Sequence, residues 1–255
     1  MKKLLRRFRH SAFRALAWLE SRYDRAYLVA DVPLHHARPE PWNLPNYVQP
    51  RDGRLRVLEI GSREVTGPSK ARELFAAANA DYVGFDYYPG RNVDVVGDVH
   101  SLASHFAEGD KFDIIYSIAS FEHFAMPWIV ALEIAKLLRV GGVVYVKTHF
   151  SFGTHERPWN FFQFSDMGLR VLFPRTLGFE CLESGMSNPI VGRFSSLADR
   201  SLRFQPVIGL YCGSEYLGRK VEDARAFNWS SVSVEEVVMG TTYPAPAKTA
   251  LNATP

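Results

Sequence analysis

Short apolar runs alternate with stretches of helical spacing through the middle of the chain. Because strands that alternate with helices form parallel sheets with right-handed crossovers, the pattern predicts an α/β fold. Apolar runs predict β-strands at residues 55–60, 81–86, 112–118 and 143–148. Before the last of these, apolar residues at helical spacing predict one buried helix face, made of Trp128, Ala131, Leu132, Ala135 and Leu138.

The pattern continues beyond residue 148. Ser165 and Asp166 begin a predicted helix that runs to about Phe173. Residues 177–183 predict a sixth strand and residues 206–213 a seventh, with a polar loop between them. We therefore expect a Rossmann-like, doubly wound, mostly parallel seven-stranded sheet with helices on both faces.

Changes in composition suggest four regions. A basic amphipathic helix and a proline-rich extension occupy residues 1–53, and the core occupies 54–185. Residues 186–243 are expected to complete the sheet, and 244–255 to form a disordered tail. The prolines of residues 31–53 predict an irregular segment over the core, which could cover the mouth of a ligand site.

The segment VLEIGSREVTG, at residues 57–67, joins a buried strand to a glycine turn. Gly61 would let the backbone approach a ligand, and Asp86, at the end of the next strand, could accept hydrogen bonds from both ribose hydroxyls of a nucleoside. The turn lacks the G-x-G-x-x-G spacing of dinucleotide sites. Glu59 and Glu64 would repel a pyrophosphate but suit an ammonium and a sulfonium, so S-adenosyl-L-methionine fits better than NAD.

These residues resemble the class I S-adenosylmethionine-dependent methyltransferases, of the type 11/12-like kind. The resemblance extends to GDVHSL at 97–102, KFDIIYSIASFEHF at 111–124 and EIAKLLRVGGVVYVKT at 133–148. The turn departs from the family pattern because it lacks the second and third glycines, which predicts a wider loop over 62–66. The resemblance implies a cofactor site made of Glu59, Gly61, Ser62, Asp86, Tyr87, Asp98, Val99 and Ser117.

Three histidines follow the fourth and fifth strands, where loops would lie over the cofactor: His123, His149 and His155. Methyl transfer to a hydroxyl needs a group that removes the proton, and histidine suits this role. THERPWNFFQFS, at 154–165, resembles a segment of methyltransferases associated with bacterial surface-glycan pathways, in which His155 takes the place of the family histidine. His155 and His123 are the predicted catalytic bases, with a structural, hydrogen-bonded histidine as the alternative for each.

Aromatic residues and one further pair of histidines bear on other kinds of site. Trp159, Phe161 and Phe162 form either the floor of an acceptor pocket or part of the core. His35 and His36 are adjacent and diverge on an extended chain, so no metal site is predicted.

The net charge of +3 is concentrated at one end, because residues 1–20 carry +5 and the remaining 235 carry −2. An apolar stripe accompanies these charges, so this helix either packs on the domain or lies on an anionic membrane surface. With two cysteines, Cys181 and Cys212, expected as free thiols in strands, we predict a cytoplasmic protein. Peripheral contact with the inner membrane and a transit peptide are the alternatives for residues 1–20.

The predicted function is transfer of a methyl group to a hydroxyl of a small-molecule or glycan acceptor in polysaccharide biosynthesis. We expect no nucleic-acid partner, and the oligomeric state is left open. The alternative is a catalytically silent binding or scaffold subunit that keeps the fold and is tethered to membrane enzymes. An NAD-dependent oxidoreductase is disfavoured by the missing glycine spacing.

Overall fold

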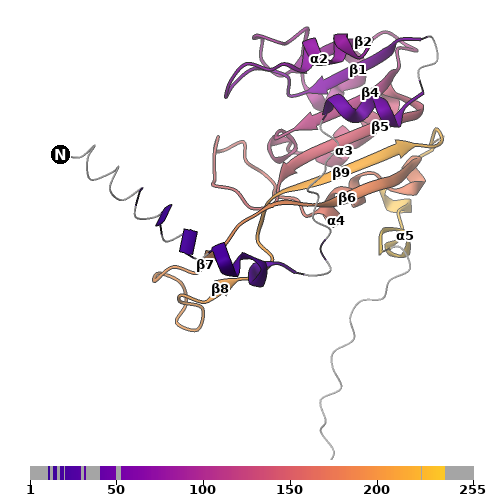
Figure 1. Ribbon diagram of the computed structural model, residues 1–255. Helices are drawn as coiled ribbons and strands as arrows, with labels where there is room; N and C mark the ends of the chain where they lie inside the picture. The colour runs from indigo at the N-terminus through magenta and orange to yellow at the C-terminus, as the bar shows by residue number, and fades with distance from the viewer. Residues whose placement is uncertain are drawn as a thin grey trace, which may run out of the picture.

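A seven-stranded sheet forms the centre of the computed structural model, in the order β3-β2-β1-β4-β5-β9-β6 (Figure 1). The structure describes residues 11, 14–15, 18–19, 21–29, 32, 41–49, 53–224 and 226–238. The strands of this sheet are β1 (Leu55–Ile60), β2 (Ala80–Asp86), β3 (Val95–Val96), β4 (Phe112–Ile118), β5 (Leu138–His149), β6 (Phe179–Pro189) and β9 (Tyr211–Lys220).

The strands on the β1 side of the sheet all run parallel. β1 pairs in parallel with β2 and β4, β2 with β3, and β4 with β5. The last strand of this sheet in chain order, β9, is antiparallel to both neighbours, β5 and β6. The expected Rossmann-like, mostly parallel seven-stranded sheet is therefore confirmed. Its parallel strands end together at one edge, which is where ligands bind in such sheets.

Helices cover both faces of the sheet. On one face α3 (Pro127–Leu137) and α4 (Asp166–Leu172) contribute Ile134 and Leu169 to a core with Leu58 and Val144. On the other, α2 (Ala71–Ala77) and η2 (Pro41–Tyr47) contribute Phe75 and Leu44. The remaining helices are short: η1 (Ser21–Tyr27), η3 (Val99–His105), η4 (Phe121–His123), η5 (Arg175–Leu177), η6 (Trp229–Ser231) and α5 (Val234–Val238).

The predicted face of α3 was partly wrong. Ala131 and Ala135 are buried as expected, but Trp128 is 39% exposed and Leu138 already belongs to β5. The buried residues also include Val130, Ile134 and even Glu133, whose carboxylate accepts a hydrogen bond from the Ala103 backbone N–H. Nearly the whole helix is apolar, so its sequence leaves more than one choice of inward face.

The seventh strand of the large sheet lies later in the chain than predicted. Residues 206–207 form β8 (Pro206–Val207), which pairs with β7 (Gly192–Arg193) in a separate two-stranded sheet. The strand that joins the large sheet is β9, and only its first three residues fall within 206–213. Residue 185, the expected end of the core, lies inside β6. The division of the chain into four regions stays a prediction.

Residues 41–49 do not cover the ligand edge. Leu44 and Val48 are buried, and the carbonyls of Gln49 and Tyr47 accept hydrogen bonds from Arg139, near the start of β5, and from Arg219, near the end of antiparallel β9. This is the edge at which the parallel strands begin. The rest of the proline-rich segment, most of residues 1–20 and the tail lie outside the described residues.

Candidate functional site

The glycine turn after β1 lies at the carboxyl edge of the sheet. Gly61 has a φ of 83°, and a Cβ built on it would lie 2.0 Å from Ser120 Oγ, so no other residue fits here without rearrangement. The backbone N–H groups of Gly61 and Ser62 donate to the carbonyl of Phe85, at 2.9 and 3.1 Å. These bonds hold the turn against the end of β2, beside Asp86.

Asp86 ends β2 next to this turn, as predicted. Its carboxylate accepts hydrogen bonds from the backbone N–H of Arg63, at 3.2 Å, and of Tyr88, at 3.0 Å. Arg63 Nε lies 3.5 Å from the same carboxylate, and the Asp86 side chain is 15% exposed. Each carboxylate oxygen retains lone-pair capacity for a ribose hydroxyl. Asp86 thus also holds the wide 62–66 loop in place, through its hydrogen bond with the Arg63 backbone N–H.

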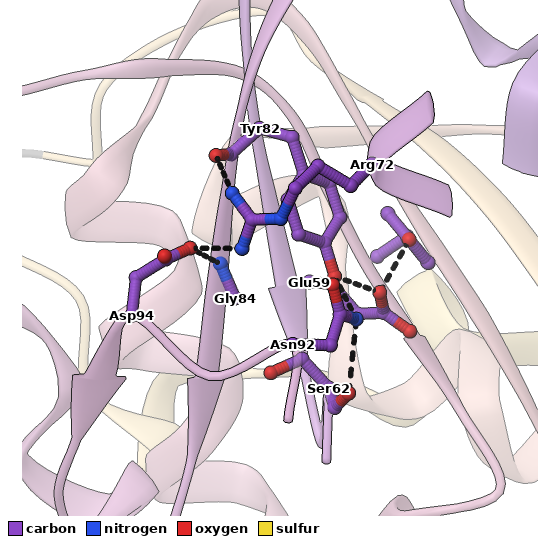
Figure 2. A network of polar contacts seen from close by, with 8 residues as sticks. Glu59, Ser62, Arg72, Tyr82, Gly84, Asn92 and Asp94 are labelled. Carbon is purple, nitrogen blue, oxygen red and sulfur yellow. Dashed lines mark hydrogen bonds and ion pairs between the residues drawn. The ribbon is translucent and has the colours of Figure 1, made fainter. Parts of the chain in front are cut away.

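Glu59 is connected to the turn by a network of hydrogen bonds (Figure 2). Its carboxylate accepts hydrogen bonds from the hydroxyls of Tyr82 and of Tyr116, the latter at 2.7 Å. The amide of Asn92 donates to Tyr82 Oη at 2.8 Å and to the Ser62 carbonyl at 3.0 Å. Glu59 therefore reaches the turn through two side chains, and its direct contact with a ligand stays a prediction.

The loop that follows β2 has a second attachment, also drawn in Figure 2. The Asp94 carboxylate accepts hydrogen bonds from the Gly84 backbone N–H, at 2.8 Å, and from Arg72 of α2, at 2.7 Å. A Cβ on Gly84 would lie 2.0 Å from the Asn92 carbonyl, so glycine lets this loop fold onto the strand. Interactions with β2 and α2 thus hold this loop in place.

Burial raises the pKa of the Glu59 carboxyl above its ordinary value of 4.5, and the hydrogen bonds from the two tyrosines only partly offset this. A raised folded-state pKa means that stability falls as the pH rises from about 4.5 through the folded value. We expect Glu59→Gln to remove this loss, so that the variant gains stability relative to the wild type between pH 4.5 and pH 7.5. Urea unfolding at both pH values measures the difference, and the exposed Glu73→Gln is the matched control. If the stability difference between Glu59→Gln and the wild type were the same at both pH values, the raised pKa of Glu59 would be contradicted.

The other predicted cofactor residues differ in availability. The Ser62 and Ser117 side chains are buried, and Ser117 Oγ donates to the Ile60 carbonyl at 2.9 Å. Tyr87 is 59% exposed, and its ring packs edge-on against that of Tyr88. Val99 is buried in the core. Ser117 thus braces the end of β1, while Tyr87 is free to cover a ligand.

Asp98 caps η3 and binds a histidine. Its carboxylate accepts from the His100 backbone N–H, at 2.9 Å, and lies 2.7 Å from His100 Nδ1. Burial opposes ionisation of Asp98, but these contacts with His100 outweigh it and keep the carboxyl pKa below its ordinary value. An ionised acid that remains 55% exposed suits the predicted contact on the adenine side.

The three histidines gather at the ends of β4 and β5. The ring centroid of His155 lies 4.8 Å from that of His123 and 5.3 Å from that of His149. His123 Nδ1 lies 2.7 Å from the Trp159 carbonyl, and His149 stacks on Phe152. The two predicted bases therefore share one small space, and His149 belongs to the same group.

Glu122 is the residue that sequence reasoning missed. It is fully buried, its Oε2 accepts a hydrogen bond from the Thr148 hydroxyl at 2.6 Å, and its Oε1 lies 2.7 Å from His149 Nδ1. Burial raises the pKa of this carboxyl, but the contacts with His149 and Thr148 lower it by more. The pKa therefore lies below the ordinary value of 4.5. The Glu-His pair that ends KFDIIYSIASFEHF was the available signal, and only its histidine received a role.

The aromatic residues of the loop divide between surface and core. Trp159 and Phe161 are 60% and 43% exposed, whereas Phe162 packs against the core. The backbone N–H groups of Phe161 and Phe162 donate to the Glu122 carbonyl, at 2.8 and 3.2 Å. The loop is thus attached to the histidine group, and two of its aromatic faces remain open to an acceptor.

The chain matches the family described as Methyltransferase domain over residues 23–179. An uncharacterized methyltransferase of Mycolicibacterium gilvum (strain PYR-GCK) is 30% identical over 114 residues, which are 40% of this chain. The match spans 43% of the length of that relative.

Solved structures also align with this chain over about two thirds of its length. The YcgJ protein from Bacillus subtilis has a TM-score of 0.45 at 17% identity, covering 67% of this chain and 93% of that one. Magnesium protoporphyrin IX methyltransferase from Synechocystis, solved with bound S-adenosylmethionine, has a TM-score of 0.42 at 14% identity, covering 67% and 72%.

Proposed function

The chain belongs to the methyltransferase-domain family, and from this premise we propose that it transfers a methyl group from S-adenosyl-L-methionine to a hydroxyl of a sugar or surface-glycan precursor. The main support for this cofactor is that Gly61 and Asp86 lie next to each other at the ends of adjacent strands. An open glycine turn beside a carboxylate that can accept ribose hydroxyls is the arrangement that a bound nucleoside requires.

The acceptor side of the proposal rests on the histidine group. Methyl transfer is an in-line displacement, so the protein has to orient the acceptor oxygen and assist the loss of its proton. His155 and His123 are the residues proposed for this, and both lie at the same edge of the sheet as the cofactor turn. The exposed faces of Trp159 and Phe161 support a sugar acceptor, because aromatic rings stack on the apolar faces of sugar rings.

Two measurements test the proposal. Calorimetry with S-adenosyl-L-methionine and with its demethylated product should give micromolar-range binding to the folded protein. Incubation with methyl-labelled cofactor and a panel of hydroxyl, amine and thiol acceptors should label hydroxylated sugars, with a mass shift of one methyl group. Label on amines or thiols alone would overturn the acceptor class. Absence of heat with either ligand would leave the silent scaffold subunit as the better account.

We also propose peripheral membrane contact through residues 1–20. Leu19 of the apolar stripe is 56% exposed and the neighbouring Trp18 is 67% exposed, which does not support packing of this part of the segment on the domain. Among the described residues, no helix is both long enough and apolar enough to cross a bilayer. The proposed contact of residues 1–20 is surface binding by their basic and apolar side chains.

Deletion of residues 1–20 should weaken association with anionic vesicles and leave cofactor affinity unchanged. Each basic residue near such a surface contributes about 1 kcal/mol, and the segment carries six. Co-sedimentation with anionic and with neutral vesicles at low salt measures this. A full-length chain that ignores anionic vesicles would show that the basic segment has another role.

A further inference from the structure

The geometry points to a divalent-cation site formed by Glu122, His123 and His155 at the carboxyl ends of β4 and β5. Each of these side chains offers one ligand atom, and the three atoms lie within 4.8 Å of one another. Two imidazole nitrogens and one carboxylate oxygen are a donor set typical of zinc and related transition-metal ions. No metal site was predicted from the sequence, because only His35 and His36 were considered for one. The present three residues come from two segments more than thirty positions apart.

Backbone carbonyls fix the two imidazoles in the orientation that a ligand needs. His123 Nδ1 lies 2.7 Å from the Trp159 carbonyl, and His155 Nδ1 lies 3.0 Å from the Gly153 carbonyl. Because a carbonyl oxygen only accepts hydrogen bonds, each neutral ring carries its proton on Nδ1. Each Nε2 then keeps a free lone pair, as in metal-binding histidines whose other ring nitrogen donates to a carbonyl.

The carboxylate oxygen of this set has no hydrogen bond. Glu122 is fully buried, and Oε2 is satisfied by Thr148. Oε1 lies 2.7 Å from His149 Nδ1, but neither atom makes a hydrogen bond of acceptable geometry. Because a carboxylate oxygen has more than one lone pair, Oε1 can bind a cation and still keep its contact with His149.

The spacing suits a small cation. Zinc bonds of roughly 2.0–2.2 Å place two tetrahedral ligand atoms about 3.4 Å apart. His123 Nε2 lies 3.9 Å from Glu122 Oε1, so a closure of about 0.5 Å would complete this pair. His155 is on the exposed 151–161 loop, whose end is tied to the Glu122 carbonyl through Phe161. This loop can therefore supply the adjustment while the buried carboxylate stays fixed.

Three protein ligands leave one coordination position of the cation for an acceptor oxygen. This role of the cation in methyl transfer rests on the proposed function. A hydroxyl bound to the cation loses its proton more readily, and that proton passes to water. The oxygen then bonds to the methyl carbon as the sulfur–carbon bond breaks, and the sulfur keeps the bonding electron pair. In this arrangement His123 and His155 assist the loss of the acceptor proton as ligands of the cation, and do not remove it themselves.

Calorimetry on the untagged full-length protein, first freed of metal with a chelator, tests the site directly. Titration with ZnCl₂ should show one equivalent bound with micromolar or tighter affinity. Glu122→Gln, His123→Gln and His155→Gln should each weaken binding at least tenfold. The controls are His105→Gln, at an exposed histidine elsewhere, and the double variant His35→Gln/His36→Gln; both should bind as the wild type does.

Two further readouts keep the outcome clear. Substitution with Co²⁺ should give visible absorption bands that are lost in His155→Gln, a loop variant whose fold is checked by circular dichroism. Binding of the demethylated cofactor is measured on the same samples. No zinc binding by the wild type, or binding unchanged in all three variants, would overturn the site. If the demethylated cofactor still bound, the proposed function would survive that result.

Discussion

Replacing Asp86 with alanine should lower the affinity for S-adenosyl-L-methionine by about 10²- to 10⁴-fold. The carboxylate is expected to accept two charge-assisted hydrogen bonds from the ribose, each contributing about 1.5 to 3 kcal/mol. It also anchors the 62–66 loop through the Arg63 backbone N–H, so the turn should loosen in this variant. Calorimetry with the cofactor and with its demethylated product measures the change.

Two companion variants separate charge from position. Asp86→Asn loses the charge but keeps one acceptor oxygen, for the backbone N–H of either Arg63 or Tyr88, and should cost about tenfold in affinity, less than alanine. Asp81→Asn alters the opposite end of the same strand, where Asp81 pairs with Arg54 at the surface, and should have no effect. Equal affinities in all three variants would place the nucleoside elsewhere.

The largest effect on catalysis is expected from His155→Gln, which should lower the turnover number by about 10²- to 10⁴-fold with nearly unchanged cofactor affinity. The reason is that His155 acts on the acceptor oxygen, whether it removes the proton itself or holds a cation. Steady-state turnover with a methyl acceptor, together with calorimetry for the cofactor, measures both quantities.

His123→Gln distinguishes the two roles. If one histidine is the base, the two variants should differ, and a larger loss at position 123 would move the assignment to the end of β4. If both are ligands, the variants should lose activity together and lose bound metal in parallel. Mild, equal losses with metal retained would mean that positioning alone drives transfer, and neither role would stand.

The cofactor edge was predictable because its signals are local. Gly61 follows a run of apolar residues directly, and Asp86 ends the next one, so strand ends could be located from each segment alone. Parallel strands end at the same edge, which brings these residues together without any knowledge of register. The same reasoning placed the three histidines above that edge.

The features that were missed depend on contacts between distant segments. The pairing of Glu122 with His149 follows from the register of β4 with β5, which puts Ile118 beside Lys147. The supports of the wide turn, Tyr82 and Asn92, have side chains whose roles appear only when β2 and the loop after it fold onto the turn. No spacing rule within one segment reports such contacts.

Insertion of β9 between β5 and β6 makes the order of synthesis important for folding. The family match ends at residue 179, and β9 begins only at Tyr211. A nascent chain that has emerged only to residue 205 would already hold most of the apolar core, yet the facing edges of β5 and β6 would both be unpaired. Open strand edges of this kind recruit other chains, and non-local pairings of this kind form slowly. Closure of the sheet should therefore be the late step during which the protein is most exposed to aggregation.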